Sequence, residues 1–422
     1  MKEITSLEEA TAAFLAYSPP GMKGKYTLER MVELMAFLGN PQEKVKVVHI
    51  AGTSGKTSTA YFIRALLEAA GKRTGLTVSP HIVAVNERLQ IDGEPLNETS
   101  YLAYLNRFFA LLQGTNIQPT YFELLIAFAY WVFAEEKLEY AVIETGLGGL
   151  LDGTNVVQRP DKVCVITDIG LDHTDILGET VEEIAAQKAG IIQHKNQVIM
   201  HAQSAEINAV FAARATEKQA SLAYVKPQSQ TVKTVSALQK RNWQLAFATF
   251  EYVRHRDALP VLSPDRVEWA ALQTPPGRWE FYRYKDKTII LDGAHNPQKM
   301  ELFARSLTQQ GVKDAALMMN LMSAPEKKIQ ETVAIIAPFA RHVIIPEFAA
   351  GQDLKSRHSV DGKELAALFV AEDVTAQLAG SVEAAVAMLL SRPEKTLIIT
   401  GSLYLVSFAR PYILKLKDEA NE

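Results

Sequence analysis

The chain has 422 residues, 48% of them hydrophobic and 22% charged, which is typical of a globular protein with large hydrophobic cores. This length predicts two or three domains, and the net charge of −4 gives no indication of a nucleic-acid or membrane partner. The single cysteine, Cys164, excludes intrachain disulfides and thiolate metal clusters. The first residues form no apolar signal region, so we expect a cytoplasmic protein.

Two helices are predicted within residues 5–38, on either side of a break at Ser18-Pro19-Pro20-Gly21. A β-branched strand then spans 44–49, and an amphipathic helix spans 59–70. The glycine-containing stretch between this strand and this helix is the most informative part of the chain.

That stretch is Gly52-Thr53-Ser54-Gly55-Lys56-Thr57-Ser58. A glycine turn between a strand and a helix directs backbone N–H groups at a bound phosphate, and Lys56 adds a positive charge. The hydroxyl of Thr57 or Ser58 suits Mg²⁺. Only two residues separate the glycines, fewer than in the usual phosphate-binding loop, so an ordinary strand–helix turn is the alternative interpretation.

Strands and helices continue to alternate beyond this loop. The expected strands are near 73–78, 140–144 and 162–168, and the expected helices are near 98–113, 120–137 and 180–189. Such alternation predicts a doubly wound α/β fold with a parallel sheet, whose ligands bind at the carboxyl ends of the strands.

Ser79, Glu144 and His173 each lie just past a predicted strand, so we expect them to meet the glycine loop in one crevice. Glu144 lies where a Mg²⁺–phosphate site needs a carboxylate, although a charged residue that simply ends a strand gives the same pattern. His173 fits a metal or phosphate site in that company, whereas alone it is interpreted as structural. Lys188, on a predicted helix, is interpreted by itself as a surface lysine.

A proline-rich stretch at 259–276 is the predicted linker between domains of residues 1–273 and 274–422. Before it, residues 225–240 are interpreted as an irregular crossover, followed by a helix from Asn242. Beyond it, strands are expected near 287–292, 314–320, 341–346 and 395–400, and helices near 297–310, 325–337, 361–371, 380–391 and 402–417. This pattern predicts a second, smaller, Rossmann-like α/β domain.

In that second domain, a strand turns into a helix through Asp292-Gly293-Ala294-His295-Asn296-Pro297. Asp, His and Asn side chains at such a turn act as helix caps and turn formers, or they hold the ribose of a nucleotide. The residues alone leave both interpretations open.

Eight motifs now stand in a fixed order along nearly the whole chain. They are Gly52-Thr53-Ser54-Gly55-Lys56-Thr57-Ser58, Ser79-Pro80-His81, Glu87-Arg88, Glu144-x-Gly-x-Gly-Gly, Leu171-Asp172-His173-Thr174, Lys188-Ala189-Gly190-Ile191-Ile192, Asp292-Gly293-Ala294-His295-Asn296-Pro297 and Gly401-Ser402-Leu403-Tyr404. As a set, they resemble the folylpolyglutamate synthase/dihydrofolate synthase family of the Mur ligase superfamily.

The resemblance implies ATP-dependent amide ligation through an acyl phosphate. A folate-type carboxylate attacks the γ-phosphate of ATP, and the amino group of L-glutamate then displaces phosphate. The implied cofactors are ATP and Mg²⁺. The implied partners are small-molecule substrates, namely folate or dihydropteroate and L-glutamate, with no nucleic acid, no membrane and a monomeric protein.

The resemblance also assigns roles to individual residues. The nucleotide is held by Gly52, Thr53, Ser54, Gly55, Lys56, Thr57, Ser58, Asn242, Arg278, Asp292 and His295. Mg²⁺ is bound by Ser58, Ser79, Glu144 and His173. The catalytic set is Lys56, His173 and Lys188, the last of which is carbamylated in the family. The substrate contacts are His81, Arg88, Phe122 and Asp152.

Departures from the family pattern bear on the acceptor. Ser54 and Thr57 make the glycine loop more like that of the cell-wall Mur ligases, and Leu150 stands where the family often has arginine. A Mur-type ligase that joins an amino acid to a non-folate acceptor is therefore the first alternative. A P-loop ATPase that acts as a switch is the second, and the predicted nucleotide-contacting second domain counts against it.

Overall fold

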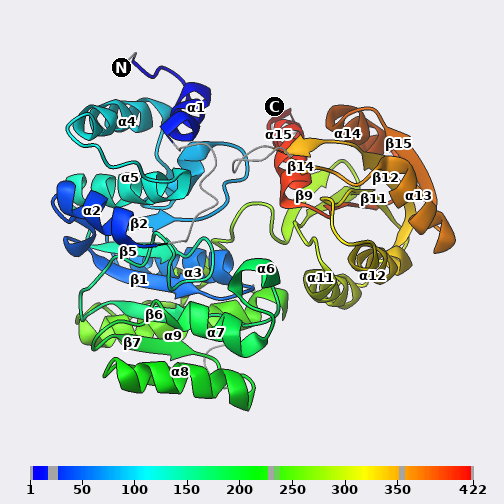
Figure 1. Ribbon diagram of the computed structural model, residues 1–422. Helices are drawn as coiled ribbons and strands as arrows, with labels where there is room; N and C mark the ends of the chain where they lie inside the picture. Colours follow the sequence, from blue (N-terminus) through cyan, green and yellow to red (C-terminus); the bar gives the residue numbers. More distant parts are fainter. Residues whose placement is uncertain are drawn as a thin grey trace. The chain divides into compact units, whose positions relative to one another are not determined.

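The computed structural model describes residues 3–17, 27–226, 232, 235, 237–350 and 357–419. The chain forms two compact units, one of Met1–Val235 and Gln239–Gln273 and the other of Ser236–Leu238 and Thr274–Glu422. Each unit is built on a sheet of its own (Figure 1). The predicted α/β fold with mainly parallel sheets is confirmed.

The first unit contains an eight-stranded sheet in the order β4-β3-β2-β5-β1-β6-β7-β8. All neighbouring strands pair in parallel except β3 and β4, which form an antiparallel edge. The central strands are buried along almost their whole length, which is typical of a parallel sheet covered by helices on both faces. The strands are β1 (Lys46–Ala51), β2 (Thr74–Thr77), β3 (Gln90–Ile91), β4 (Glu94–Pro95), β5 (Tyr140–Glu144), β6 (Val163–Ile166), β7 (Gln197–Met200) and β8 (Ser221–Tyr224).

Alternate residues of these strands belong to different cores. Val48 and Ile50 of β1 share a cluster with residues of α3, α9 and α10, whereas Ala141 and Ile143 of β5 share one with residues of α4 and α5. A third cluster joins β6 and β7 to α7 and α8. The helices are α1 (Leu7–Tyr17), α2 (Glu29–Phe37), α3 (Lys56–Ala69), α4 (Glu98–Leu112), α5 (Tyr121–Glu135), α6 (Thr174–Leu177), α7 (Val181–Ala189), α8 (Ala205–Glu217), α9 (Ala237–Arg256) and α10 (Pro264–Ala271).

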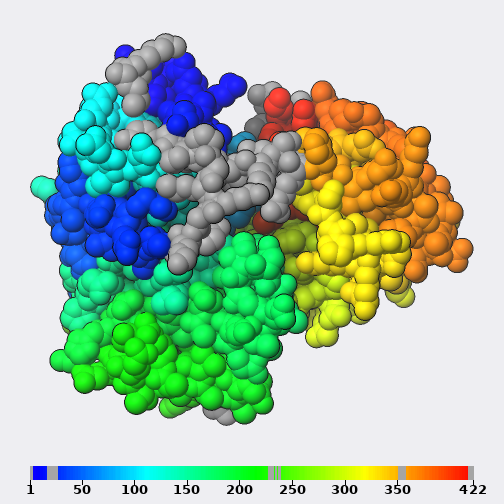
Figure 2. All heavy atoms as spheres, viewed as in Figure 1, coloured from blue at the N-terminus to red at the C-terminus, as the bar shows by residue number. Residues whose placement is uncertain are grey.

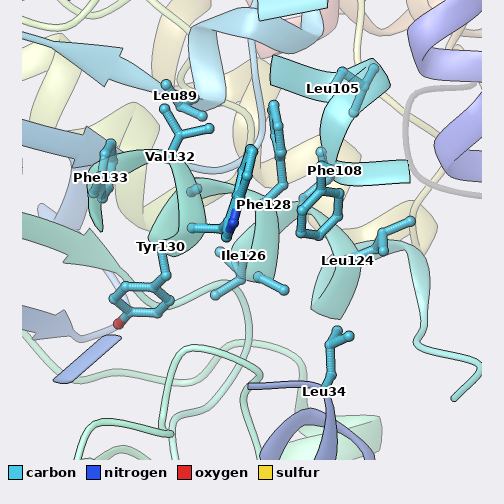
Figure 3. Close-up of a cluster of buried hydrophobic side chains, with 14 of the residues drawn as sticks. Leu34, Leu89, Leu105, Phe108, Leu124, Ile126, Phe128, Tyr130, Val132 and Phe133 are labelled. Atoms are coloured by element: carbon cyan, nitrogen blue, oxygen red, sulfur yellow. The ribbon is translucent and has the colours of Figure 1, made fainter. Parts of the chain in front are cut away.

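Aromatic side chains of α4 and α5 form a large part of one core (Figure 3). Phe108 of α4 packs on Phe128 of α5 with ring centroids 5.2 Å apart. Tyr130 lies apart from these rings, and its hydroxyl donates to the carbonyl of Thr154 at 3.4 Å. None of the described helices is long and apolar enough to cross a membrane. Helix α5 is buried along most of its length and belongs to this core.

The second unit contains a six-stranded sheet in the order β15-β12-β11-β16-β10-β9, parallel except for the edge strand β9. Its strands are β9 (Glu280–Tyr284), β10 (Lys287–Leu291), β11 (Ala315–Met319), β12 (Ala340–Pro346), β15 (Thr375–Ala379) and β16 (Thr396–Thr400), with a separate pair β13 (Ala349–Ala350) and β14 (Arg357–His358). Its helices are α11 (Pro297–Gln309), α12 (Glu326–Ile336), α13 (Gly362–Ala371), α14 (Val382–Ser391) and α15 (Leu403–Glu419). A short 3₁₀ helix lies at Ala337–Phe339 in this unit, and two more lie at Pro41–Glu43 and Val85–Arg88 in the first unit.

The predicted linker at 259–276 contains α10, a helix of the first unit that packs against α3. Pro264 occupies the first turn of α10, where proline is well tolerated, so this proline begins a helix and does not mark a linker. The division between the two units falls near the end of the stretch, between Gln273 and Thr274. Five further elements were not predicted from the sequence, namely β7, α8, β8, β9 and β15. The break at 18–21 and much of the crossover at 225–240 lie outside the described residues.

Candidate phosphate-binding site

The glycine loop between β1 and α3 is fastened to the segment that follows β6. The N–H groups of Thr53 and Ser54 donate to the carbonyl of Asp168 at 2.8 and 3.3 Å. The Thr53 hydroxyl also donates to the carbonyl of Gly170 at 3.0 Å. The loop therefore has a fixed shape at the carboxyl edge of the sheet, where a parallel α/β fold binds its ligands.

Gly55 is required at the turn into α3. Its φ of 88° lies in the left-handed region, and a Cβ atom there would lie 2.2 Å from Oδ1 of Asn242. Only glycine accommodates both conditions. Asn242, placed at the nucleotide by the family resemblance, thus lies directly against the loop.

Two groups of the loop are suited to an anion. Nζ of Lys56 donates to the carbonyl of Gly52 at 2.9 Å, so the ammonium group is held over the loop. The hydroxyl oxygen of Ser54 is buried and has no hydrogen-bond partner within the part of the chain that the structure describes. A buried polar atom without a partner costs free energy, and a phosphate oxygen in the loop would satisfy it.

Glu144 ends β5 and joins two neighbouring segments. Its carboxylate accepts the Thr57 hydroxyl at 2.9 Å and the backbone N–H of Ser79 at 3.4 Å, and the residue is 2% exposed. The structure brings Thr57 to this carboxylate, rather than the Ser58 that the resemblance assigned to Mg²⁺. Ser58 is buried one residue further along α3.

The charge of Lys56 acts on two other basic groups, His173 and Lys188. Burial, together with the charge of Lys56, lowers the pKa of Lys188 to about 7 against the opposing charges of Asp172 and Asp152. Burial also lowers the pKa of His173, as do the charges of Lys56 and Lys188. The segment of His173 and α7 is part of the surface of the first unit (green in Figure 2), with the His173 side chain 54% exposed. Lys188, by contrast, is buried and is not the surface lysine that it resembles in isolation.

The donors at this edge fit one kind of metal ion. Across the described residues, no group of three or more His, Cys, Asp or Glu side chains is placed to hold a metal. A hydroxyl (Thr57) and a carboxylate (Glu144) are hard oxygen ligands, and Mg²⁺ in phosphate sites takes few such protein ligands beside waters and phosphate oxygens. The donor set therefore fits Mg²⁺ bound together with a nucleotide, and it lacks the ligands of a protein cage for zinc.

The expected substrate residues fall into two groups. His81 and Arg88 form a buried pair in which Nε of Arg88 donates to Nδ1 of His81 at 2.8 Å. Burial, helped by the charge of Arg88, lowers the pKa of His81 to about 3, so this imidazole is neutral. Phe122 lies against Gly146, since a Cβ atom on that glycine would be 2.5 Å from the ring.

Asp152, the remaining residue expected to contact substrate, has both oxygens hydrogen-bonded within the protein. It is 6% exposed, and its two oxygens accept the N–H groups of Leu147 and Thr154 at 2.7 and 3.0 Å and the Thr154 hydroxyl. The carboxylate therefore holds the protein's own loop. No sequence pattern indicates this role, because the partners of Asp152 include backbone N–H groups.

In the second unit, Asp292 accepts the N–H groups of Trp279 and Ala294, each at 2.9 Å. His295 shares a hydrogen bond with the carbonyl of Gly293 at 2.7 Å, and Asn296 caps α11. The turn-forming interpretation of this motif is thus realised in the structure. Arg278 lies close enough for its charge to lower the pKa of Asp292, against the dominant effect of burial, which raises it.

The chain matches two family models along most of its length. Residues 50–263 match the Mur ligase middle domain, and residues 279–409 match the dihydrofolate synthetase C-terminal domain. A dihydrofolate synthase/folylpolyglutamate synthase of Bacillus subtilis is 30% identical over 91% of this chain and 94% of its own length. A folylpolyglutamate synthase of Lacticaseibacillus casei is also 30% identical, again over 91% of this chain and 94% of its own.

Solved structures agree with these relatives. A folylpolyglutamate synthase of Mycobacterium tuberculosis complexed with ADP has a TM-score of 0.81 and 27% identity, and the likeness covers 98% of this chain and 99% of that one. A folylpolyglutamate synthase of Thermotoga maritima has a TM-score of 0.80 and 25% identity over 97% and 96%. The chain belongs to the folylpolyglutamate synthase/dihydrofolate synthase family, within the Mur ligases.

Proposed function

We propose that the chain is an ATP-dependent ligase that joins L-glutamate to a folate-type carboxylate, as a folylpolyglutamate synthase, a dihydrofolate synthase or both. The observation that carries the proposal is the contact of Thr57 with Glu144 beside the glycine loop, in a chain that matches ligases of this family from end to end. A phosphate cradle next to a hard-oxygen metal site is what activation of a carboxylate by ATP requires.

The nucleotide phosphates occupy the glycine loop in this proposal. Backbone N–H groups at the start of α3, the Ser54 hydroxyl and Lys56 bind the phosphates and offset their charge. The Asn242 side chain packs against the loop at Gly55. Arg278, Asp292 and His295 of the second unit supply the remaining nucleotide contacts. Thr57, Glu144, Ser79 and His173 hold Mg²⁺, which supplies charge neutralisation at the transferring phosphoryl group.

Lys188 is proposed as the carbamylated lysine of the family. An amine must be neutral to react with CO₂, and a pKa of about 7 leaves a large neutral fraction at physiological pH. His81, Arg88 and Phe122 are proposed to line the acceptor site. The chemistry then needs no protein nucleophile, because the substrate carboxylate attacks the γ-phosphate, ADP leaves, and the glutamate amine displaces phosphate from the acyl phosphate.

The decisive measurement is release of ADP with L-glutamate and a panel of acceptors: dihydropteroate, folates of different glutamate length, and cell-wall precursors. Folate-type acceptors should support release, and dihydropteroate separates the two activities from each other. Activity with a cell-wall precursor alone would establish the Mur-type alternative, and glutamate-independent ATP hydrolysis would establish the switch.

The metal assignment has a matched pair of variants. Thr57→Val should raise the Mg²⁺ concentration needed for half-maximal rate by at least about tenfold, because it removes the hydroxyl beside Glu144. Ser58→Ala should leave that requirement within about twofold of wild type. A raised Mg²⁺ requirement in Ser58→Ala, with an unchanged requirement in Thr57→Val, would show that Ser58 is the metal ligand.

A further inference from the structure

A row of buried polar side chains runs from the middle of β1 to the loop that follows β5. His49 and Thr154 are both 0% exposed, and Nε2 of His49 lies 2.8 Å from the Thr154 hydroxyl oxygen. The same hydroxyl donates to Oδ1 of Asp152, whose Oδ2 accepts the Leu147 N–H. We name His49, Thr154 and Asp152 the polar relay.

The direction of each hydrogen bond in the polar relay is fixed by its members. Both oxygens of Asp152 already accept backbone N–H groups, and the Thr154 hydroxyl gives its single proton to this carboxylate. The hydroxyl oxygen can then only accept from His49, which must carry its proton on Nε2. Nδ1 of His49 is buried and has no partner among the described residues, so a proton there would be unsatisfied.

The far end of the polar relay reaches Lys188 through the glycine-rich loop. The N–H of Leu150 donates to the carbonyl of Gln187 at 2.7 Å. A Cβ atom on Gly149 would lie 3.1 Å from Cα of Lys188, so loop and helix α7 touch through their backbones. A shift of the loop that Asp152 holds is therefore transmitted directly to the Lys188 backbone.

We propose that His49 is a positioning residue: its Nε2–H directs the Thr154 hydroxyl onto Asp152, and Asp152 thereby holds the 146–150 loop and Lys188 in their working positions. The inference rests on the proposed ligase function for its kinetic consequence only, since the geometry of Lys188 is measurable without turnover. His49 lies too deep in the sheet to touch a substrate.

Matched substitutions separate positioning from simple packing. Thr154→Val keeps the volume and removes the hydroxyl, whereas Thr154→Ser keeps the hydroxyl. His49→Leu removes the donor, whereas His49→Gln restores an N–H at the position of Nε2. We expect kcat to fall at least about tenfold in Thr154→Val and His49→Leu, with KM for ATP within about twofold, and to recover largely in Thr154→Ser and His49→Gln.

His342→Leu is the control, because His342 is a buried strand histidine of the second unit without a place in the polar relay. A double variant tests the route: His49→Leu added to Asp152→Asn should cost no more than about twofold beyond Asp152→Asn alone. Fully additive losses, equal effects of the valine and serine variants, or an equal loss in His342→Leu would overturn the proposal.

A second readout is independent of ligation. Labelling of Lys188 by cyanate, mapped by mass spectrometry, should change at least about threefold in Thr154→Val and His49→Leu and stay near wild type in Thr154→Ser. Unchanged labelling in all four variants overturns the positioning role. Altered labelling in a protein that ligates no acceptor would uphold the polar relay and refute the proposed function instead.

Discussion

Asp152 of the first unit and Asp292 of the second are two buried carboxylates that each hold a loop, and they do so with different support. Both accept two backbone N–H groups, and burial raises the pKa of both. Asp152 also accepts the Thr154 hydroxyl, which in turn is hydrogen-bonded to His49. The charge of Asp152 acts on Lys188, whereas the charges of Arg278 and Lys299 act on Asp292.

The difference indicates how each loop is tied to function. A carboxylate that accepts only backbone N–H groups, as Asp292 does among the described residues, fixes a turn without engaging the neighbouring side chains, which can then bind a ligand. A carboxylate held through a threonine and a histidine depends on side chains in the middle of the sheet. Function in the first unit should therefore be sensitive to substitutions far from any substrate, and function in the second unit should not.

The largest expected effect tests which unit carries the phosphate chemistry. Lys56→Ala removes the ammonium group held over the glycine loop, so we expect ligation to fall at least about 1000-fold. Arg278→Ala should cost only about tenfold, mainly as a higher KM for ATP. The measurement is steady-state ADP release by both variants, with circular dichroism to show that each is folded. Near-normal turnover of a folded Lys56→Ala protein would refute the role of the loop.

The second prediction compares the carboxylates directly. Asp152→Ala leaves the N–H groups of Leu147 and Thr154 buried without a partner, and Asp292→Ala does the same to those of Trp279 and Ala294. Each variant should therefore lose about 2–4 kcal/mol of stability. Denaturant unfolding should show the loss in the transition of the unit that carries the change. Only Asp152→Ala should also alter cyanate labelling of Lys188.

A loss below about 0.5 kcal/mol in either variant would mean that water satisfies the freed N–H groups. Asp152→Asn and Asp292→Asn are the controls, because an amide oxygen still accepts one of the two N–H groups and should retain part of the stability. If Asp292→Ala altered Lys188 as strongly as Asp152→Ala does, the contrast between the two loops would fail.

The glycine loop, Glu144 and the alternation of strands and helices were predictable because they rest on local patterns. A strand, a glycine turn and a helix occupy neighbouring residues, and β5 is a continuous apolar run. The contact of Thr57, rather than Ser58, with Glu144 was not predictable, since it depends on where a helix places two adjacent hydroxyls relative to a distant carboxylate. The sequence left both open for that reason.

Other contacts were unpredictable for the same physical reason. Nothing local shows that backbone N–H groups bind both oxygens of Asp152. His49 sits in an apolar strand 105 residues away from its partner Thr154, and no periodicity reports such a pairing. Strand β9 was missed because its alternating exposure is that of a sheet edge, where burial contributes little signal.

The third prediction uses the environment of Lys188. Because its pKa is lowered to about 7, the neutral amine should form as pH rises through about 7, rather than near 10.4 as for an ordinary lysine. Cyanate labelling at pH 7.5 should thus be at least about tenfold faster at Lys188 than at the exposed Lys363. The labelling rate of Lys188 divided by that of Lys363, which cancels the pH dependence of the reagent, should be greatest at or below pH 7 and should fall as pH rises toward 10. A ratio that stays constant from pH 6 to pH 10 would contradict the lowered pKa.

The smallest effect concerns a third carboxylate, the partly buried Glu68 of α3, which is held by a side chain instead of backbone groups. Oε2 accepts Nη1 of Arg64 at 2.9 Å, and the hairpin of β3 and β4 covers the pair, since a Cβ atom on Gly93 would lie 2.5 Å from that nitrogen. Burial nevertheless outweighs the charge of Arg64 and raises the pKa of Glu68 from 4.5 to about 7. The ion pair with Arg64 therefore does not fully offset the free-energy cost of burying the charged carboxylate.

A raised pKa in the folded state means that protonated Glu68 stabilises the fold. That contribution is fully present below the unfolded value of 4.5 and is lost as pH rises to about 7. Between pH 5 and pH 8, wild type should therefore lose on the order of 1 kcal/mol of stability relative to Glu68→Gln, which stays neutral throughout. Denaturant unfolding of both proteins at several pH values measures the difference. Parallel stability curves for the two proteins would show that Arg64 keeps Glu68 ionised over this range, so that the ion pair offsets the cost of burying the carboxylate.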